Sequence, residues 1–335
     1  MEKEIYKKNP IKNLQNQQWA AVLIGIILLF SILALFQPAF LQVTNLMNII
    51  GQCSLYGIMA VGMTFVISTG GIDISVGMNA LFTMALMYKL SQFFPVPVVF
   101  LIALATGCLI GFLNGFMASV LNFPDMIATL ASMSILSGGA FLLLDNSQKF
   151  VPDPMRVIGN TKIFDIVPTP ALLMILITVI GFCVLRYTRF GRYVLAVGGS
   201  RNSAIYSGIN VTRIRIGAYV ICGICAAVGG IVYAGRIGSI APNSAQGYEF
   251  TVITAVVLGG TKMSGGKSSV IGAVLGCLFL YLVENAMTML QISSYYQMFA
   301  RAIIMLAVIT IDAVTSSRSQ AAMVNERKRR ILQIH

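Results

Sequence analysis

The sequence predicts an all-α integral membrane protein with about ten transmembrane helices and both termini on the cytoplasmic side. Of its 335 residues, 57% are hydrophobic and only 10% are charged, whereas a soluble domain carries about a quarter charged residues. The hydrophobic residues form runs close to the roughly 20-residue length that crosses a bilayer. Basic residues gather between these runs, and loops rich in Lys and Arg stay on the cytoplasmic side.

Ten apolar runs are candidate spans. The first could be mistaken for a signal peptide, but its apolar run is too long and no small-x-small cleavage site follows it, which predicts an uncleaved anchor. The third and the eighth runs are short for a complete crossing, and the eighth is the weakest candidate. The runs are 19–36, 47–68, 76–90, 96–121, 126–144, 171–185, 216–234, 250–258, 270–290 and 298–311.

The distribution of basic residues predicts the orientation. With the N-terminus inside, 17 of the 23 Lys and Arg residues are cytoplasmic, and an even number of spans returns the C-terminus to the same side. The chain is then one transmembrane permease domain, 1–335, with a cytoplasmic tail 1–18, a cytoplasmic loop 186–215 and a basic tail 313–335. The external segment 145–170 is either an ordered contact for an outside partner or a plain connector.

The loop 186–215 is the expected docking surface for a cytosolic partner. It contains six basic residues and no acidic residue, set between long apolar runs. A cluster of one sign of charge favours binding to a complementary surface. The six residues are Arg186, Arg189, Arg192, Arg201, Arg213 and Arg215.

Several function classes lack the residues that they need. The one histidine is the last residue, His335, so neither histidine-based catalysis nor a metal-ligand cluster is expected. Cys222 and Cys225 form a CxxC within an apolar helix that has no second pair, which favours small buried residues. The net charge of +12 is not arranged as a basic stripe with stacking aromatics, so no nucleic-acid partner is predicted.

Regularly spaced glycines indicate where spans pack together. Gly107, Gly111 and Gly115 repeat every four residues in one run, and Gly272 and Gly276 do so in another. Small residues at this spacing let two helix backbones approach closely. We expect a packing role for these glycines.

Two opposite charges in the last two spans predict an ion pair. Glu284 and Arg301 lie at similar distances from the outer ends of adjacent antiparallel spans. A charge at membrane depth costs a few kcal/mol unless it is paired or hydrated. We therefore expect a structural pair with head groups within about 8 Å.

Two glycine-rich segments interrupt apolar runs and resemble each other. Aligned on the glycine pairs 70–71 and 259–260, Asp73 falls opposite Lys262. Broken helices at membrane depth occur where they are buried or line a hydrated path, and glycine permits the turn. An accidental match of two short glycine turns is the alternative. The candidate path or hinge residues are Gly70, Gly71, Asp73, Ser75, Asn79, Glu249, Gly259 and Gly260, with Thr83 and Asn114 as further polar liners or helix contacts.

The second glycine-rich segment nearly matches a nucleotide-binding loop. The pattern G-x-x-x-x-G-K-[ST] needs a glycine five residues before Gly266, but Thr261 occupies that position. The sequence also lacks a soluble α/β domain that would hold a nucleotide. We expect no ATP hydrolysis by this chain.

Four sets of motifs, in this order, resemble the membrane subunits of ABC importers, specifically the permeases of ribose-type monosaccharide transporters. The resemblance covers about residues 41–312. The motifs are AVGMT at 60–64 with GGIDISVG at 70–77, FGRY at 190–193 with AVGG at 196–199 and SGINV at 207–211, GYE at 247–249 with AVVLGGT at 255–261, and ISSYYQ at 292–297.

The resemblance implies a transport subunit and not an enzyme, in the plasma (inner) membrane of a bacterium. Two permeases, as a homodimer or with a close relative, would form the path for a monosaccharide such as ribose, surrounded by membrane lipid. A separate cytoplasmic ATP-binding cassette subunit would bind ATP-Mg, and an extracytoplasmic binding protein would deliver the sugar. No cofactor is expected on this chain.

The resemblance also implies a short coupling helix within 198–210, which would transmit movement of the ATPase to the pore. This segment falls inside the arginine-rich loop identified from charge alone. The candidate ATPase-coupling residues are Gly198, Gly199, Arg201, Ala204, Ser207, Gly208 and Ile209.

Three positions depart from the family pattern. Ser200-Arg201 stands where Asn-Glu is usual, which changes the charge at the expected ATPase contact. Ser137 stands where Arg is usual, which removes a buried cation. Asp125 follows Pro124 at a position where an apolar residue is common.

Two other function classes fit the sequence less well than an importer subunit does. An ion-coupled secondary transporter of a small polar solute would bind its substrate near mid-membrane, but Asp73 and Glu249 are expected nearer to span ends. An intramembrane enzyme would need a nucleophile with a base or a metal cluster, and the sequence offers neither.

Overall fold

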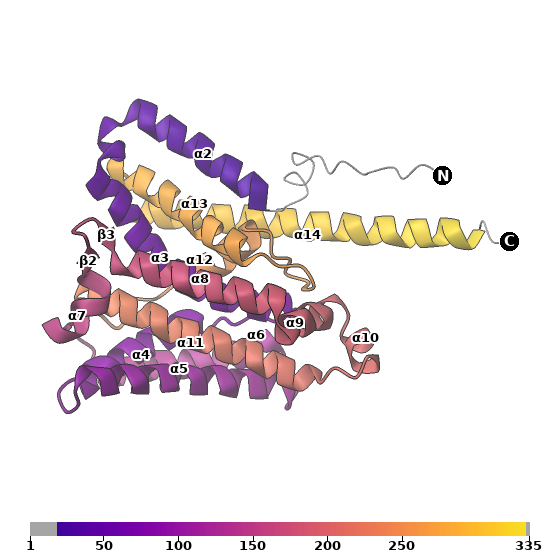
Figure 1. Cartoon of the computed structure of the whole chain (residues 1–335), viewed down its shortest axis with the longest axis horizontal. Coiled ribbons are helices and arrows are strands. Elements are labelled where there is room, and N and C mark those ends of the chain that lie inside the picture. The colour runs from indigo at the N-terminus through magenta and orange to yellow at the C-terminus, as the bar shows by residue number, and fades with distance from the viewer. Residues whose placement is uncertain (1–18, 333–335) are drawn as a thin grey trace.

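The computed structural model is a bundle of long helices that run roughly side by side, and it describes residues 19–332 (Figure 1). The predicted all-α multi-pass fold is confirmed. The tail 1–18 lies outside the described residues. Eight of the described helices are long and apolar enough to cross a membrane. They are α2 (Trp19–Phe36), α3 (Val43–Ser68), α5 (Val96–Ser119), α6 (Asp125–Leu143), α8 (Thr169–Tyr187), α11 (Val211–Ile237), α13 (Val270–Met289) and α14 (Ser294–Leu332).

Two apolar helices are shorter, and they are the third and eighth predicted spans. Helix α4 (Val76–Leu90) has 15 residues, and α12 (Tyr248–Leu258) has 11. At 1.5 Å per residue α12 is about 17 Å long, which is roughly half of the bilayer core. The prediction that both would be short is confirmed, and α12 begins within the bundle.

The two ends of the bundle differ in structure (Figure 1). One end, here called the basic end, carries α9 (Arg189–Gly199), α10 (Arg201–Tyr206), the start of α2 and the last part of α14. The opposite end carries α7 and two pairs of short antiparallel strands, together with the 3-10 helix η1 between α2 and α3. Their bounds are α7 (Asp153–Asn160), β1 (Lys149–Phe150) paired with β4 (Ser239–Ile240), β2 (Lys162–Ile163) paired with β3 (Val167–Pro168), and η1 (Pro38–Leu41).

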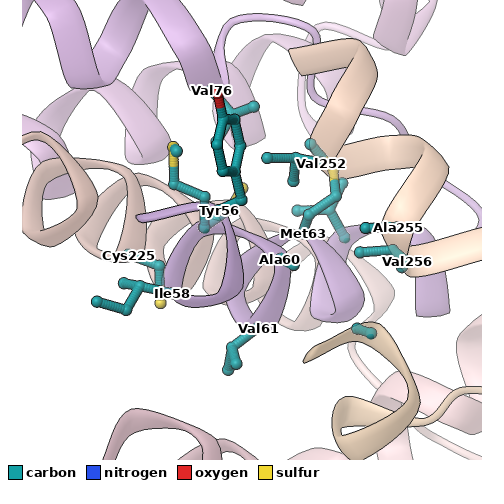
Figure 2. Close-up of a cluster of buried hydrophobic side chains, with 14 of the residues drawn as sticks. Tyr56, Ile58, Ala60, Val61, Met63, Val76, Cys225, Val252, Ala255 and Val256 are labelled. Carbon is teal, nitrogen blue, oxygen red and sulfur yellow. The ribbon is translucent and has the colours of Figure 1, made fainter. Parts of the chain in front are cut away.

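Helix α3 is the centre of the bundle and contacts α8, α11, α12 and α13. Its side chains Tyr56, Ile58 and Met63 belong to the largest cluster of buried apolar residues, shown in Figure 2. Cys222 and Cys225 of α11 are buried in this cluster as free thiols. The interpretation of the CxxC as small buried residues is therefore confirmed.

The predicted glycine contacts are also confirmed. Gly107, Gly111 and Gly115 of α5 lie against the backbone of α11, and a Cβ atom at Gly115 would be 2.8 Å from the Ile216 Cα. Gly276 of α13 lies against the Ala255 backbone of α12 in the same way. A side chain at these positions would force the paired helices apart, because each neighbour is a backbone atom.

Most of the segment 186–215 is helical, although the sequence predicted a loop. Three polar side chains cap successive helices by accepting a hydrogen bond from the backbone three residues later: Thr188 begins α9, Ser200 begins α10 and Asn210 begins α11. Such caps satisfy N–H groups that the first helical turn leaves free. These caps therefore mark where three separate helices begin.

The C-terminal helix is longer than predicted. The last span was expected to end at residue 311, but α14 continues to Leu332. More than half of the added residues are good helix formers, mainly Arg and Ala. The apolar pattern marked where the membrane-spanning part of this helix stops and not where the helix itself ends.

Candidate coupling and translocation site

The two glycine-rich segments form the same turn after a helix. Gly70 ends α3 with φ of +79°, and Gly260 ends α12 with φ of +92°. The Gly70 N–H donates to the Ile67 carbonyl, and the N–H of the following residue donates to the carbonyl five residues before it. The same two hydrogen bonds form after α12. This is the Schellman arrangement, in which glycine takes the left-handed conformation that other residues avoid. The predicted echo is therefore structural.

The register of that echo differs by one residue from the sequence alignment. The structure pairs Gly70 with Gly260, and not with Gly259. Asp73 then corresponds to Met263 instead of Lys262. The alignment failed because the first residue after α3 is Thr69, whereas the first residue after α12 is itself a glycine.

The two turns meet each other and the end of α9 in what we call the glycine junction: Ser68, Gly70, Gly198, Gly265 and Gly266. The Gly266 N–H donates to the Ser68 carbonyl at 3.1 Å. A Cβ atom at Gly198 would fall on the Ser68 carbonyl oxygen, and one at Gly265 would lie 2.8 Å from the Gly70 nitrogen. Three backbones that are distant in sequence are thus in direct contact, which only residues without a side chain allow.

The polar residues that follow the first turn form a buried cluster. Ser75 donates to Asp73 Oδ1 from its backbone nitrogen at 2.9 Å and from its hydroxyl at 2.7 Å. Asn114 of α5 donates to the Ser75 hydroxyl at 2.8 Å. All three side chains are at most 1% exposed within this chain. The cluster fixes the segment 69–75 between α3 and α4, and its predicted role in the solute path stays a prediction.

Two other candidate path residues lie deeper in the bundle. Asn79 accepts a hydrogen bond from Thr83 at 3.4 Å, and both side chains are buried. Glu249 in the first turn of α12 is 1% exposed, and its Oε2 has no hydrogen-bond partner among the described residues. Gly77 lies beside this oxygen, where a Cβ atom would be 2.6 Å from it.

The depth of Glu249 corrects the sequence prediction. Glu249 was expected near a membrane boundary. It lies instead inside the bundle, at the start of the half-length helix α12 and nine residues before Leu258. It is therefore about 14 Å from the basic end of that helix, which is near the middle of a bilayer. The sequence could not show this, because a half-length helix and a truncated apolar run look alike.

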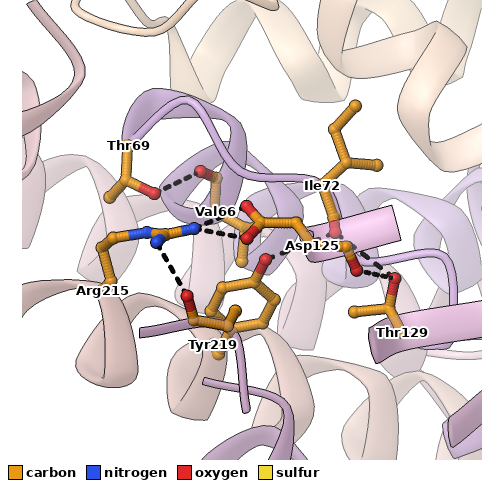
Figure 3. A network of polar contacts seen from close by, with 8 residues as sticks. Val66, Thr69, Ile72, Asp125, Thr129, Arg215 and Tyr219 are labelled. Carbon is orange, nitrogen blue, oxygen red and sulfur yellow. Dashed lines mark hydrogen bonds and ion pairs between the residues drawn. The ribbon is translucent and has the colours of Figure 1, made fainter. Parts of the chain in front are cut away.

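An ion pair that the sequence analysis missed joins α11 to α6. Arg215 Nη2 lies 2.5 Å from Asp125 Oδ1, and Arg215 Nη1 donates to the Ala118 carbonyl at 3.1 Å (Figure 3). The two charged side chains are only 10% and 17% exposed. Arg215 was assigned to the exposed loop, but it lies in the first turns of α11 and faces the bundle.

The same group of residues holds the segment between α3 and α4. Tyr219 donates to the Ile72 carbonyl at 3.3 Å (Figure 3). The Ile74 N–H donates to the Thr129 hydroxyl at 3.2 Å. We call Arg215, Asp125, Tyr219 and Thr129 the Arg215 network. Through it α6 and α11 both fix the backbone next to Asp73.

The segment 198–210 is therefore connected to the turn after α3 at both of its ends. Gly198 at its start touches Ser68, and Arg215, five residues beyond its end, belongs to the network that holds Ile72. A displacement of this segment must therefore move either the glycine junction or α11. Packed elements of this kind transmit shifts because they cannot deform continuously.

A short helix, α10, lies in the segment where the resemblance implies a coupling helix, and its coupling role stays a prediction. Ala204 is 3% exposed and packs with Val197 and Val211, so this side of α10 is held against its neighbours. Ile205 and Tyr206, which the sequence analysis did not select, are 53% and 91% exposed. Of the predicted coupling residues, two face inward and four are exposed, while Gly198 lies in the junction. The inward residues are Ala204 and Ile209, and the exposed ones are Gly199, Arg201, Ser207 and Gly208.

The predicted ion pair in the last two spans is formed. Arg301 Nη2 of α14 lies 2.9 Å from Glu284 Oε1 of α13. The pair is far from the glycine junction, because both residues lie on the half of their helices toward the opposite end. Its contacts join α13 to α14, as expected of a structural pair.

Arg301→Gln is expected to lower the midpoint of thermal unfolding in detergent, because Glu284 would lose its oppositely charged partner. The loss should be about 1 kcal/mol, since the two side chains are 30% and 28% exposed and partly screened. Adding Glu284→Gln should regain most of it. Lys89→Gln, on an exposed residue of α4, is the control. An unchanged midpoint in the single variant would contradict a stabilising pair.

The eight long apolar helices among the described residues define a class of protein, the multi-pass membrane proteins. The particular family is given by comparison with known proteins. The chain belongs to the family described as the branched-chain amino acid transport system permease component, whose model matches residues 45–309.

Individual relatives are similar over most of their length. The ribose import permease protein of Escherichia coli (strain K12) is 36% identical over 299 residues, which cover 87% of this chain and 92% of that protein. The ribose import permease protein of Bacillus subtilis (strain 168) is 33% identical, with coverage of 88% and 92%. An autoinducer 2 import system permease protein of Photorhabdus luminescens is 32% identical, with coverage of 90% and 92%. No solved structure matches the chain.

Proposed function

We propose that this chain is the membrane permease subunit of an ATP-driven importer and forms part of the path for a monosaccharide such as ribose. The sugar class is supported by relatives named as import permeases for ribose and for autoinducer 2. The observation that carries the mechanism is the double connection of segment 198–210 to the turn after α3. It gives a route by which a partner at the basic end acts on the membrane-buried segments.

Three partners belong to this proposal. A cytoplasmic ATP-binding cassette subunit, which holds ATP-Mg, contacts α10 at the basic end, where Ile205 and Tyr206 are exposed. A second permease copy completes the path. An extracytoplasmic sugar-binding protein contacts the opposite end, which α7 and the short strands cover. The excess of basic residues at the α9–α10 end supports its cytoplasmic placement.

The direct test is reconstitution in proteoliposomes with the ATPase and the sugar-binding protein. ATP-dependent uptake of labelled ribose, or of another monosaccharide, is the expected result. Uptake that needs no ATP and follows an ion gradient would instead favour a secondary transporter. Because Glu249 is a buried carboxylate near mid-depth, the same vesicles should be assayed with and without a proton gradient.

Gly199→Trp tests the coupling segment. Gly199 is exposed, and a Cβ atom there would meet nothing within 4 Å, so the fold should accept the indole. Sugar-stimulated ATP hydrolysis should fall about tenfold or more, because a bulky group at the contact separates the subunits and each 1.4 kcal/mol of lost binding is a factor of ten. Normal stimulated hydrolysis would contradict the assignment of this contact.

Gly199→Ala is the matched control and should retain stimulated hydrolysis. Gly208→Trp is a less specific probe of the same segment. Gly208 has φ of +75°, so any side chain there adds backbone strain of about 1–2 kcal/mol before contact with a partner is considered. Gly208→Ala, which carries the strain without the bulk, separates the two effects.

A further inference from the structure

A cavity of about 790 Å³ opens at the basic end beside α2, α8 and α13. Its volume is within the range of small-ligand sites. The walls come from the starts of α2 and α13, the end of α8, and part of α9. Three spanning helices thus reach their termini around it, which places the cavity at the boundary between the bilayer and water.

The lining of the cavity is strongly basic. It includes Arg186, Arg192 and Lys267, and none of the lining residues within the described range 19–332 is acidic. None of the three forms an ion pair within the described part of the chain. These groups can together bind a phosphate anion.

Apolar and aromatic side chains also line the cavity. They include Trp19, Phe182, Leu185 and Ile271, and Ile271 is 41% exposed. Tryptophan is enriched at the level of lipid headgroups, and basic pockets between membrane helices bind anionic lipid headgroups. A free phosphate would contact the basic residues alone. Basic and apolar side chains in one lining fit an amphipathic anion.

We propose that this cavity binds the headgroup of an anionic phospholipid, with the phosphate among Arg186, Arg192 and Lys267 and an acyl chain against Phe182 and Ile271. A bound lipid would link α2 to α8 and α9. It would therefore join the first helix to the coupling segment that α9 precedes. The site does not depend on which solute is transported.

The chain contains its own reporter, because Trp19 is the only tryptophan and it lines the cavity. The full-length protein is reconstituted in phosphatidylcholine vesicles with increasing fractions of phosphatidylglycerol brominated on its acyl chains, which quenches Trp19 on contact. Brominated phosphatidylcholine gives the reference. We expect about a tenfold preference for phosphatidylglycerol, which three partly screened cations near the surface can supply.

The variant with Arg186→Gln, Arg192→Gln and Lys267→Gln should lose this preference. The matched control is Arg189→Gln, Arg201→Gln and Arg213→Gln, which removes the same charge from exposed residues of the same region that do not line the cavity. It should keep the preference. An equal loss in both variants, or a loss in neither, would overturn the site.

Two measurements on the unaltered protein keep the proposal testable if the triple variant does not fold. Addition of inorganic phosphate at 10 mM, roughly the concentration that would saturate a millimolar anion site, should leave the preference unchanged. Its disappearance would show a site for free phosphate and overturn the lipid assignment. Raising the salt concentration should reduce the preference, since the basic residues are partly exposed, and a salt-independent preference would contradict a role for them.

Discussion

Gly198→Ala is expected to abolish ATP-driven sugar uptake and to lower the midpoint of thermal unfolding by several degrees. The added Cβ would fall on the Ser68 carbonyl oxygen and 2.5 Å from the Gly266 nitrogen. Both are backbone atoms, so no change of rotamer can relieve the overlap. Overpacking costs typically 1–3 kcal/mol, and we expect about 3 kcal/mol here. The hydrogen bond from Gly266 to Ser68 should break as the three segments separate.

Gly199→Ala is the matched control, because it makes the same substitution at the next residue of the same helix. A Cβ at Gly199 meets nothing within 4 Å. Alanine also favours the helical state over glycine by about 1 kcal/mol, so the unfolding midpoint should stay the same or rise slightly. The measurements are unfolding in detergent and uptake in proteoliposomes. If the two variants behave alike, close contact at the glycine junction is not needed for either stability or transport.

Local patterns in the sequence predicted much of this fold. Apolar length alone located both ends of α2 and of α4. The four-residue glycine spacing predicted a close helix contact on α5, and the structure shows that the partner is α11. The pairing of Glu284 with Arg301 followed from depth, since adjacent spans run antiparallel. Each of these inferences uses residues within one span or in two adjacent spans. The bilayer adds the constraint that every span must satisfy its own backbone hydrogen bonds.

Contacts between distant segments were not predictable in the same way. Asp125 was noted as an unusual residue and Arg215 as one of six loop arginines, but nothing in the sequence paired them across 90 positions. Gly198 was selected for its position in a motif, whereas its contact with Ser68 and Gly266 depends on how α9 folds back onto α3. Helix order around the bundle determines such contacts, and apolar periodicity does not encode that order.

The corrections share one cause. Glu249 was placed too near a span end, α14 was ended too early, and the glycine turns were aligned one residue out of register. In each case the sequence shows where an apolar run or a glycine pair begins. The bounds of the helix, however, are determined by the hydrogen bonds at its ends. Capping residues such as Thr188 and Ser200 carry that information, and reading them would have divided the predicted loop correctly.

Arg215→Met is expected to destabilise the protein by about 3–5 kcal/mol, the usual effect of leaving one buried charge without its partner. Asp125, which is 17% exposed in the intact protein, would lose its charged partner beside the Tyr219 hydroxyl. Arg213→Met, two residues earlier on an exposed position, is the matched control and should change stability by no more than about 0.5 kcal/mol. The midpoint of thermal unfolding in detergent measures both. Equal midpoints would show that the ion pair contributes nothing.

The double variant Asp125→Leu with Arg215→Met separates stability from coupling. Replacing a buried ion pair with apolar residues is often neutral or stabilising, so the unfolding midpoint should return close to its original value. Uptake should nevertheless stay several-fold lower, because α11 would lose its charged contact with α6 beside Ile72, and the segment 198–210 would be connected to the turn after α3 only through Gly198. Full recovery of uptake together with stability would contradict this role and reduce the Arg215 network to a packing element.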